Sequence, residues 1–433
     1  RWADMGNEGW AYKDILKYFK KLETMNIPKL KSDNTYHGTD GPVHITSPLY
    51  QTPLAEIFLK AGKELQYPIV ADYNGKNMIG FSYPQTTIMN GTRMSSNRAY
   101  LHPIRDRDNL HITLQSTVTK ILMDTKTKRA IGVEFIKNNK IIRVFASKEV
   151  ILCAGAIGSP QLLMLSGIGP KEHLTKLNIK VLQNAPVGEN LMDHPVFLGL
   201  YWTINASISL SSSELFNPIN PYMMEFLTNR TGPWTSPGLV ETLAFINTKQ
   251  PHEHSGLPDL EFIFTGIQPI NLLMRDFKDS PSLWIKYGDR HGWSAIPILL
   301  KPKSRGRIML LANDVNVKPA IIPNYFDDPD DVKTMIAGIR TALRIGQTKT
   351  MQAFDSQLLN ITYMECDYEY DSDAYWECMI RIRSSTTFHA SGTCKMGPRG
   401  DPTAVVDPKL KVCLTKCITV FIYRVSQNSW ISF

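Results

Sequence analysis

The sequence predicts a mixed α/β fold in which a strand–turn–helix unit and an antiparallel sheet occupy different parts of the chain. The first observation is an apolar run at residues 150–152, followed by small residues and a helix start signal. The second is a series of short alternating segments between residues 197 and 311, separated by loops rich in Pro, Gly and Ser, which is typical of an antiparallel sheet. The third is the helical spacing of apolar residues over 332–345. A chain of 433 residues can form one large or two medium domains.

The stretch from Lys148 to Pro170 carries the strand–turn–helix pattern. Its apolar residues 150–152 are typical of a buried parallel strand. Ser159 and the proline after it predict a helix N-terminus, with serine as the N-cap. This geometry lets backbone approach a cofactor and points helix N–H groups at it. The stretch is almost uncharged, which leaves a membrane span as the alternative, but its proline, glutamine and glycines argue against one.

The other elements follow from local patterns taken in chain order. Apolar residues at helical spacing predict helices, and alternating residues predict strands. We expect a helix over 12–22, a strand over 41–45, a helix over 52–65, a strand over 109–118 continued by strand pairs at 121–122 and 131–135, antiparallel strands over 198–204, 242–246, 260–264, 294–300 and 307–311, and helices over 332–345 and from 375 onward.

The composition indicates an ordinary globular protein and argues against a nucleic-acid-binding protein. Hydrophobic residues make up 43% and charged residues 20% of the chain, as in an ordinary globular protein with a core. The formal net charge is +8, but the Lys and Arg residues are scattered apart from one group at 301–307. That group fits a turn between strands, so we expect no nucleic-acid partner.

Six cysteines in a chain of this length do not form a disulfide scaffold. Three of them, Cys366, Cys378 and Cys394, lie close in sequence, and one pair among them could be bridged. No second Cys/His pair stands at ligand spacing, so we expect no metal site. Four Asn-x-Ser/Thr sequons favour a secreted protein weakly; they begin at Asn90, Asn205, Asn229 and Asn360.

Two motifs resemble those of one enzyme family. The first is Gly155-Ala156-x-x-Ser159-Pro160-x-Leu162-Leu163-x-x-Ser166-Gly167-Ile168-Gly169. It resembles the second signature of the glucose-methanol-choline (GMC) oxidoreductase family at every fixed position. The second motif, Thr386–Gly397, resembles the active-site loop of that family. The similarity covers nearly the whole chain and is greatest to the insect branch of glucose dehydrogenase-like proteins.

The resemblance implies a Rossmann-like FAD-binding domain and an antiparallel-sheet substrate or cap domain that alternate along the sequence. We expect residues 1–25, 93–195 and 378–433 to form the FAD-binding domain, and residues 26–92 and 196–377 to form the cap. The N-terminal third of the FAD-binding domain, which holds the glycine-rich dinucleotide fingerprint in the family, has no counterpart here. The chain is therefore expected to be a fragment, truncated at both ends.

The resemblance also implies roles for four residues. His389 would act as the general base that removes the hydroxyl proton, since imidazole suits this task at neutral pH. Histidine cannot accept a hydride, so FAD is required and flavin N5 would be the acceptor. Ala154 and Gly155 would line the cofactor, and Val118 would contact its adenine through the backbone. From composition alone Val118 is a core valine, and His194, between Asp193 and a proline, is a structural histidine.

These features together predict an FAD-dependent oxidoreductase that acts on the CH–OH group of a small-molecule alcohol or sugar. A quinone-type compound or oxygen would accept the electrons, and the location would be extracellular. The chain also departs from the family, because Ile422 stands where an aspartate is expected and Phe433 ends the chain before a second catalytic group. The alternative is therefore a non-catalytic relative that binds a small molecule or carbohydrate. A nicotinamide dehydrogenase is disfavoured by the missing fingerprint.

Overall fold

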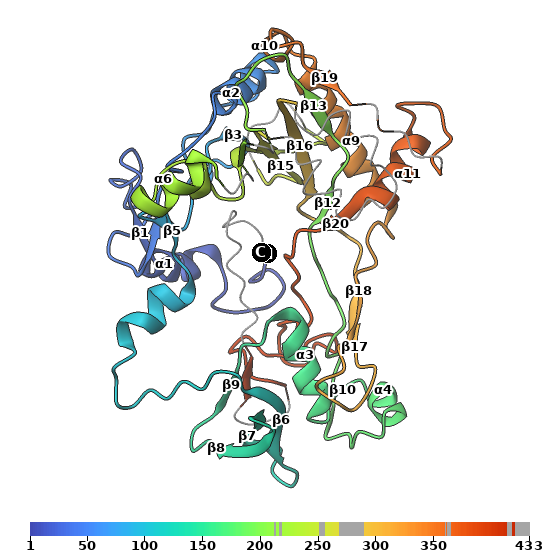
Figure 1. The fold of residues 1–433 in the computed structure, drawn as a ribbon. Coiled ribbons are helices and arrows are strands. Elements are labelled where there is room, and N and C mark those ends of the chain that lie inside the picture. The colour runs from blue at the N-terminus through green and yellow to red at the C-terminus, as the bar shows by residue number, and fades with distance from the viewer. Residues whose placement is uncertain are drawn as a thin grey trace.

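A computed structural model describes residues 1–211, 214–215, 219–250, 256–267, 290–359, 361, 365–413 and 418–420. One part of the molecule, in the upper half of Figure 1, is built on a large sheet covered by helices, and a smaller part lies below it. Long connections join the two parts. The sequon at Asn360 and the departure at Ile422 lie outside the described residues. In the described ranges, no helix combines the length and the apolar character that a membrane crossing needs.

The large sheet is antiparallel and has eight strands, which confirms the antiparallel part of the prediction. Its main path runs in the order β19-β13-β16-β15-β14-β3, and β12 joins β16 to β20. The bounds are β3 Gly80–Ser82, β12 Pro195–Phe197, β13 Tyr201–Thr203, β14 Val240–Ile246, β15 Leu260–Thr265, β16 Gly292–Leu299, β19 Gln357–Leu358 and β20 Ser384–Thr386. Each pair in it is antiparallel.

Helices cover one face of this sheet and close the larger core. They are α2 (Leu54–Glu64), α9 (Pro329–Gly346), α10 (Lys349–Gln352) and α11 (Asp373–Arg383). Asp328 caps α9, because its side chain accepts the N–H of Asp330. In the core the rings of Trp202 and Trp293 stack with centroids 4.0 Å apart, a pairing worth about 0.5–1.5 kcal/mol beyond the area it buries.

The smaller part contains the predicted strand–turn–helix unit. Strand β9 (Val150–Leu152) pairs in parallel with β21 (Ile418–Val420), and α3 (Gly155–Leu165) follows β9. Around them lie the antiparallel strands β6 (Thr117–Asp124), β7 (Arg129–Lys137) and β8 (Lys140–Phe145), the strands β10 (Ile168–Gly169) and β11 (Gln183–Asn184), α4 (Lys171–Lys176), and the pair β17 (Arg307–Met309) and β18 (Ala320–Ile322).

A third set of elements borders both parts. It comprises α1 (Tyr12–Leu22), the parallel strands β1 (Glu23–Met25) and β2 (Val43–Ile45), the hairpin of β4 (Ile88–Met89) and β5 (Thr92–Arg93), the short helices η1 (Asn97–Leu101) and η2 (His102–Ile104), α6 (Pro221–Asn229) and η3 (Pro233–Thr235). The predicted helix over 12–22 coincides with α1. The mixed helix and sheet architecture is thus the predicted one.

Three local predictions are wrong. No strand covers residues 109–116: the strand starts at Thr117, and the apolar side chain of Leu114 is 74% exposed because no partner strand covers it. Ser159 is not an N-cap, since α3 begins four residues earlier and the Ser159 hydroxyl accepts the N–H of Ala154. The strand at 307–311 pairs with β18 rather than with the large sheet.

Two separate hydrophobic clusters fill the larger and the smaller part. The predicted domain boundaries stay a prediction. Ile308 and Leu310, which lie inside the predicted cap segment, pack in the cluster of the smaller part.

The structure decides between the possible cysteine pairs, because Cys366 and Cys378 form a disulfide while Cys394 is a free, buried thiol.

A buried ionic cluster ties β1 and the loop after it to the loop before β3. His37 is 3% exposed, and its two ring nitrogens each lie 3.0 Å from a carboxylate oxygen, one of Glu23 and one of Asp72. Burial by itself lowers the pKa of His37, but the hydrogen bonds to Asp72 and Glu23 outweigh it and raise the pKa to about 9. His37 is therefore a cation at neutral pH.

This cluster predicts a pH-dependent stability. A raised histidine pKa stabilises the fold fully below the unfolded pKa near 6.5, and the contribution is lost as the pH rises to about 9. We expect the free energy of unfolding to fall by up to about 3 kcal/mol over this range. Urea unfolding at pH 6 and pH 9.5 measures it, with His37→Gln as the comparison. Equal pH dependence in the variant would contradict this assignment.

Candidate functional site

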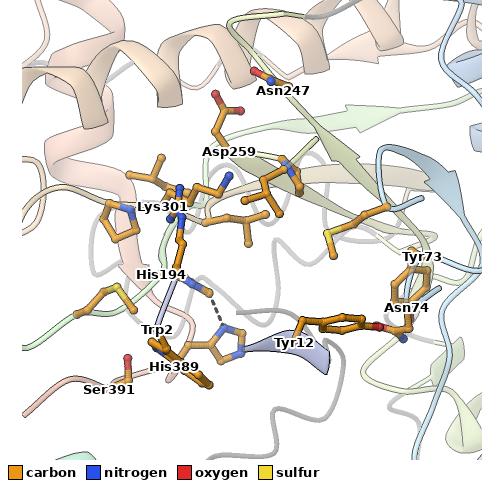
Figure 2. A pocket seen from close by; sticks show the side chains of 18 of the residues that line it. Trp2, Tyr12, Tyr73, Asn74, His194, Asn247, Asp259, Lys301, His389 and Ser391 are labelled. Atoms are coloured by element: carbon orange, nitrogen blue, oxygen red, sulfur yellow. Dashed lines mark hydrogen bonds between the residues drawn. The ribbon is translucent and has the colours of Figure 1, made fainter. Parts of the chain in front are cut away.

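A cavity of about 1270 Å³ lies where the N-terminal segment, the large sheet and the loop of His389 meet. Figure 2 shows Trp2 and Tyr12 on one side, Asp259 and Lys301 on another, and the rings of His194 and His389 pointing toward each other. Burial and the nearby charge of Arg1 lower the pKa of Lys301 to about 8, against the effect of Asp259. The wall thus combines aromatic surface with titratable groups, as ligand sites do.

The cavity wall holds a pair of histidines. Nδ1 of His194 lies 3.2 Å from Nδ1 of His389, and the rings meet edge to face with centroids 5.3 Å apart. At this distance one Nδ1 donates a hydrogen and the other accepts it, so the tautomers of the two rings are coupled. Sequence reasoning interpreted His194 as structural. The structure places its ring against that of the predicted base.

One carboxylate holds both histidines in place. Oδ1 of Asp193 accepts the backbone N–H of His194 at 2.8 Å and that of His389 at 2.9 Å. Oδ2 accepts the hydroxyls of Tyr325 and Thr386. Burial and the Asp193 carboxylate raise the pKa of Tyr325, so its hydroxyl remains a donor. Asp193 is therefore saturated with four donors and fixes the backbone on both sides of the histidine pair.

Sequence reasoning missed the role of Asp193 and of Tyr325. The only local signal was the position of Asp193 directly before His194, and a capped turn explains that equally well. The contacts themselves join residues about 130 to 200 positions apart, so no spacing in the sequence reports them.

The loop of His389 is fastened to the first turn of α3. Pro160 lies inside α3 and has no N–H, so the carbonyl of Ala156, four residues earlier, lacks its usual helical donor. The hydroxyl of Thr393 supplies one at 2.7 Å, and Thr393 is fully buried. The carbonyl of Thr393 in turn accepts the N–H of Gly188. The loop that carries the predicted base is thereby bonded to Ala156, the residue directly after the predicted cofactor residues Ala154 and Gly155.

The turn at Ala154 and Gly155 fits the predicted FAD. Gly155 has φ +76°, a conformation that glycine adopts without cost, and a Cβ built on it meets no atom within 4 Å. The open space lies at the N-terminus of an eleven-residue helix that has no side-chain cap. Such a helix end favours an anionic or electron-rich group. The residues present therefore suit a cofactor that makes close contacts with the protein backbone.

The structure brings together only some of the predicted site residues. Ala154 and Gly155 adjoin the His389 loop through Thr393 but are not among the residues that line the histidine cavity. Val118 is half-buried on β6 at an irregularity of the β6–β7 pairing, and it packs against the cluster that contains α3. It does not line the cavity either. Its predicted adenine contact stays a prediction.

No metal centre is found among the residues that the structure describes, since none of their His, Cys, Asp and Glu side chains form a group of three suited to an ion. The His37 cluster contains two carboxylates and one imidazole, but the imidazole uses both nitrogens to bridge them. It is therefore an ion-pair cluster, because neither ring nitrogen directs a lone pair at a point where a metal ion would also meet the two carboxylates.

The Thr393 bond can be tested by a double-mutant cycle. Thr393→Val leaves the buried Ala156 carbonyl without a donor and is expected to lower the free energy of unfolding by about 1–3 kcal/mol. Pro160→Ala restores an N–H four residues after Ala156, so in that background the same change is expected to cost about 1 kcal/mol less. Urea unfolding of the four proteins measures both values. Equal costs in the two backgrounds would contradict the link.

The sequence matches known proteins over most of its length. Residues 1–196 and residues 302–421 match two family models described as GMC oxidoreductase, one N-terminal and one C-terminal. Glucose dehydrogenase [FAD, quinone] of Drosophila pseudoobscura pseudoobscura is 37% identical over 415 residues, which are 95% of this chain and 64% of that protein. Alcohol dehydrogenase [acceptor] of Pseudomonas putida is 34% identical over 416 residues, 95% of this chain and 70% of that protein.

Solved structures share the fold. A formate oxidase structure of Aspergillus oryzae RIB40 superposes with a TM-score of 0.83 at 24% identity, covering 97% of this chain and 74% of that one. This similarity bears on the fold alone. The chain spans about 64% of the length of the Drosophila relative.

Proposed function

The chain belongs to the GMC oxidoreductase family, and we propose that it is an FAD-dependent oxidoreductase acting on the CH–OH group of an alcohol or sugar. The observation that carries the proposal is the His194–His389 pair, held by Asp193 at a cavity wall, on a loop that Thr393 fastens to the carbonyl of Ala156, next to Gly155. The relatives named for glucose and alcohol oxidation support the same substrate class.

In the proposed reaction, His389 takes the hydroxyl proton of the substrate. When bound, FAD supplies a hydride acceptor at flavin N5, the chemistry that imidazole lacks. If His389 accepts the proton at Nε2, its own ring hydrogen must sit on Nδ1 and be donated to Nδ1 of His194. The pair then stabilises the cationic imidazole, because His194 accepts from it. His194 is thus a positioning residue for the base.

Ala154 and Gly155 are the residues that would hold the cofactor beside the histidines, with Val118 toward its adenine. The open space at Gly155 admits close contact with the backbone, and the N-terminus of α3 favours negative charge there. Trp2, Tyr12 and the other aromatic residues of the cavity wall offer apolar surface against which the substrate would pack. We propose a quinone-type compound or oxygen as the electron acceptor, in keeping with the relative named for quinone.

We further propose that the protein is extracellular. The Cys366–Cys378 disulfide supports this, because disulfides persist mainly in secreted proteins and oxidising compartments. The four sequons in the chain agree with the same compartment.

The spectrum of the purified protein tests the function. We expect the flavin absorption bands in the protein fraction, and their loss when glucose or a primary alcohol is added without oxygen. Recovery of the bands with a quinone but not with air would identify a dehydrogenase, and recovery with air an oxidase. A protein that binds carbohydrate yet stays colourless after incubation with FAD would favour the alternative, a non-catalytic binder.

A further inference from the structure

Two sequons that are far apart in the sequence lie next to each other on the surface. Asn90 opens the two-residue turn between β4 and β5, with φ +52°, and Asn229 is the last residue of α6. The turns touch, since a Cβ on Gly91 would come within 2.3 Å of the carbonyl oxygen of Arg230. In Figure 1, α6 lies beside β1 and β5 at the left edge of the molecule.

Both asparagines are exposed and line one surface groove. The groove has a volume of about 600 Å³, and His44, Leu49 and Met89 are among the other residues that line it. It is separate from the histidine cavity, with which it shares no lining residue. The catalytic proposal therefore leaves this surface and these two sequons unused.

We propose that Asn90 and Asn229 each carry an N-linked glycan and that the two glycans together cover this groove. In the transfer, the side-chain nitrogen of asparagine forms a bond to C1 of a lipid-linked oligosaccharide. The bond from C1 to the lipid pyrophosphate breaks, and the amide loses one proton. Oligosaccharide transfer takes place in the oxidising secretory compartment in which the Cys366–Cys378 disulfide also forms.

The local geometry allows both modifications without disturbing the fold. Neither asparagine side chain donates or accepts a hydrogen bond among the described residues, and no packing contact holds either in the core. The threonines of the sequons, in contrast, are anchored: the Thr92 hydroxyl donates to the Met89 carbonyl and the Thr231 hydroxyl to Glu225. A glycan on either asparagine projects from a turn whose backbone is already fixed.

Peptide mass spectrometry of the chain, secreted from eukaryotic cells behind a leader sequence, tests the proposal. We expect glycan mass on the peptides of Asn90 and Asn229, removed by peptide N-glycosidase with conversion of each asparagine to aspartate. Asn90→Asp and Asn229→Asp should each lose one glycan, and aspartate tolerates the left-handed conformation at position 90. An unmodified Asn90 or Asn229, whether or not the exposed sequon at Asn205 is modified, would overturn the proposal.

The reactivity of His44 tests the coverage itself. His44 is half-buried in the groove, and its ring nitrogen contacts the Asn26 amide at 3.0 Å. Diethyl pyrocarbonate should modify His44 severalfold faster in the Asn90→Asp, Asn229→Asp double variant than in the glycosylated protein. His111, exposed and outside the groove, should react equally in both. An unchanged rate at His44 would show that the glycans do not cover the groove.

Discussion

Replacing His389 by alanine is expected to lower the rate of substrate oxidation by about 10²- to 10⁴-fold, the usual contribution of a general base. The proposed reaction needs a group that takes the hydroxyl proton while the carbon loses its hydride. His389 lines the cavity, and its position is set by Asp193 through the backbone. The measurement is the rate at which substrate removes the flavin absorbance in a stopped-flow experiment without oxygen.

The same variant should keep its cofactor. Ala154, Gly155 and the Thr393 link to α3 do not depend on the imidazole of His389. The matched control is His111→Ala, which removes an exposed histidine that does not line the cavity. An unchanged oxidation rate in His389→Ala, with flavin content equal to that of the control, would exclude His389 as the base.

Replacing Asp193 by alanine is expected to lower the free energy of unfolding by about 2–4 kcal/mol, because four donors lose a buried charged acceptor. It should also reduce the oxidation rate by about 10²-fold, since displacements near 1 Å at a reacting group have effects of this size. Urea unfolding and the stopped-flow rate measure the two effects separately.

Tyr325→Phe is the comparison that separates positioning from stability. It removes one hydroxyl from Oδ2 of Asp193 and leaves both backbone N–H bonds to Oδ1 in place. We expect a loss of about 1 kcal/mol in unfolding free energy and little change in rate. If Tyr325→Phe and Asp193→Ala lower the rate equally, the backbone bonds to Oδ1 are not what positions the histidines.

Much of the fold was predictable because it is encoded locally. The apolar run at 150–152 is a strand, the helical spacing over 12–22 is a helix, and the alternating segments between residues 198 and 300 contribute strands to the antiparallel sheet. Each pattern reflects which side chains must be buried together along one element. The predicted chemistry was also encoded locally, because it rests on the resemblance of two short contiguous motifs, those of Gly155 and His389, to motifs of the GMC family.

Two of the three wrong local predictions have the same origin. Residues 109–116 alternate like a strand but no strand pairs with them, and the apolar side chains of Ile112 and Leu114 stay exposed. The Ser159-Pro160 pair has the composition of a helix start, yet the Ser159 hydroxyl, inside the helix, accepts the N–H of Ala154. Because Pro160 has no N–H, the carbonyl of Ala156 accepts the hydroxyl of Thr393 instead. In both cases the outcome depends on a partner, present or absent, that the local pattern does not specify.

By itself, the sequence determined the order and type of most elements and the two motifs on which the family similarity rests, because burial periodicity and backbone chemistry act over a few neighbouring residues. Only the tertiary structure decided that His194 faces His389, that Asp193 holds both, and that Asn90 and Asn229 share a groove. Except for Asp193 and His194, which are neighbours in sequence, these residues lie about 130 to 200 positions apart. A hydrogen bond at that separation exists only after the intervening chain has packed, so no local pattern can contain it.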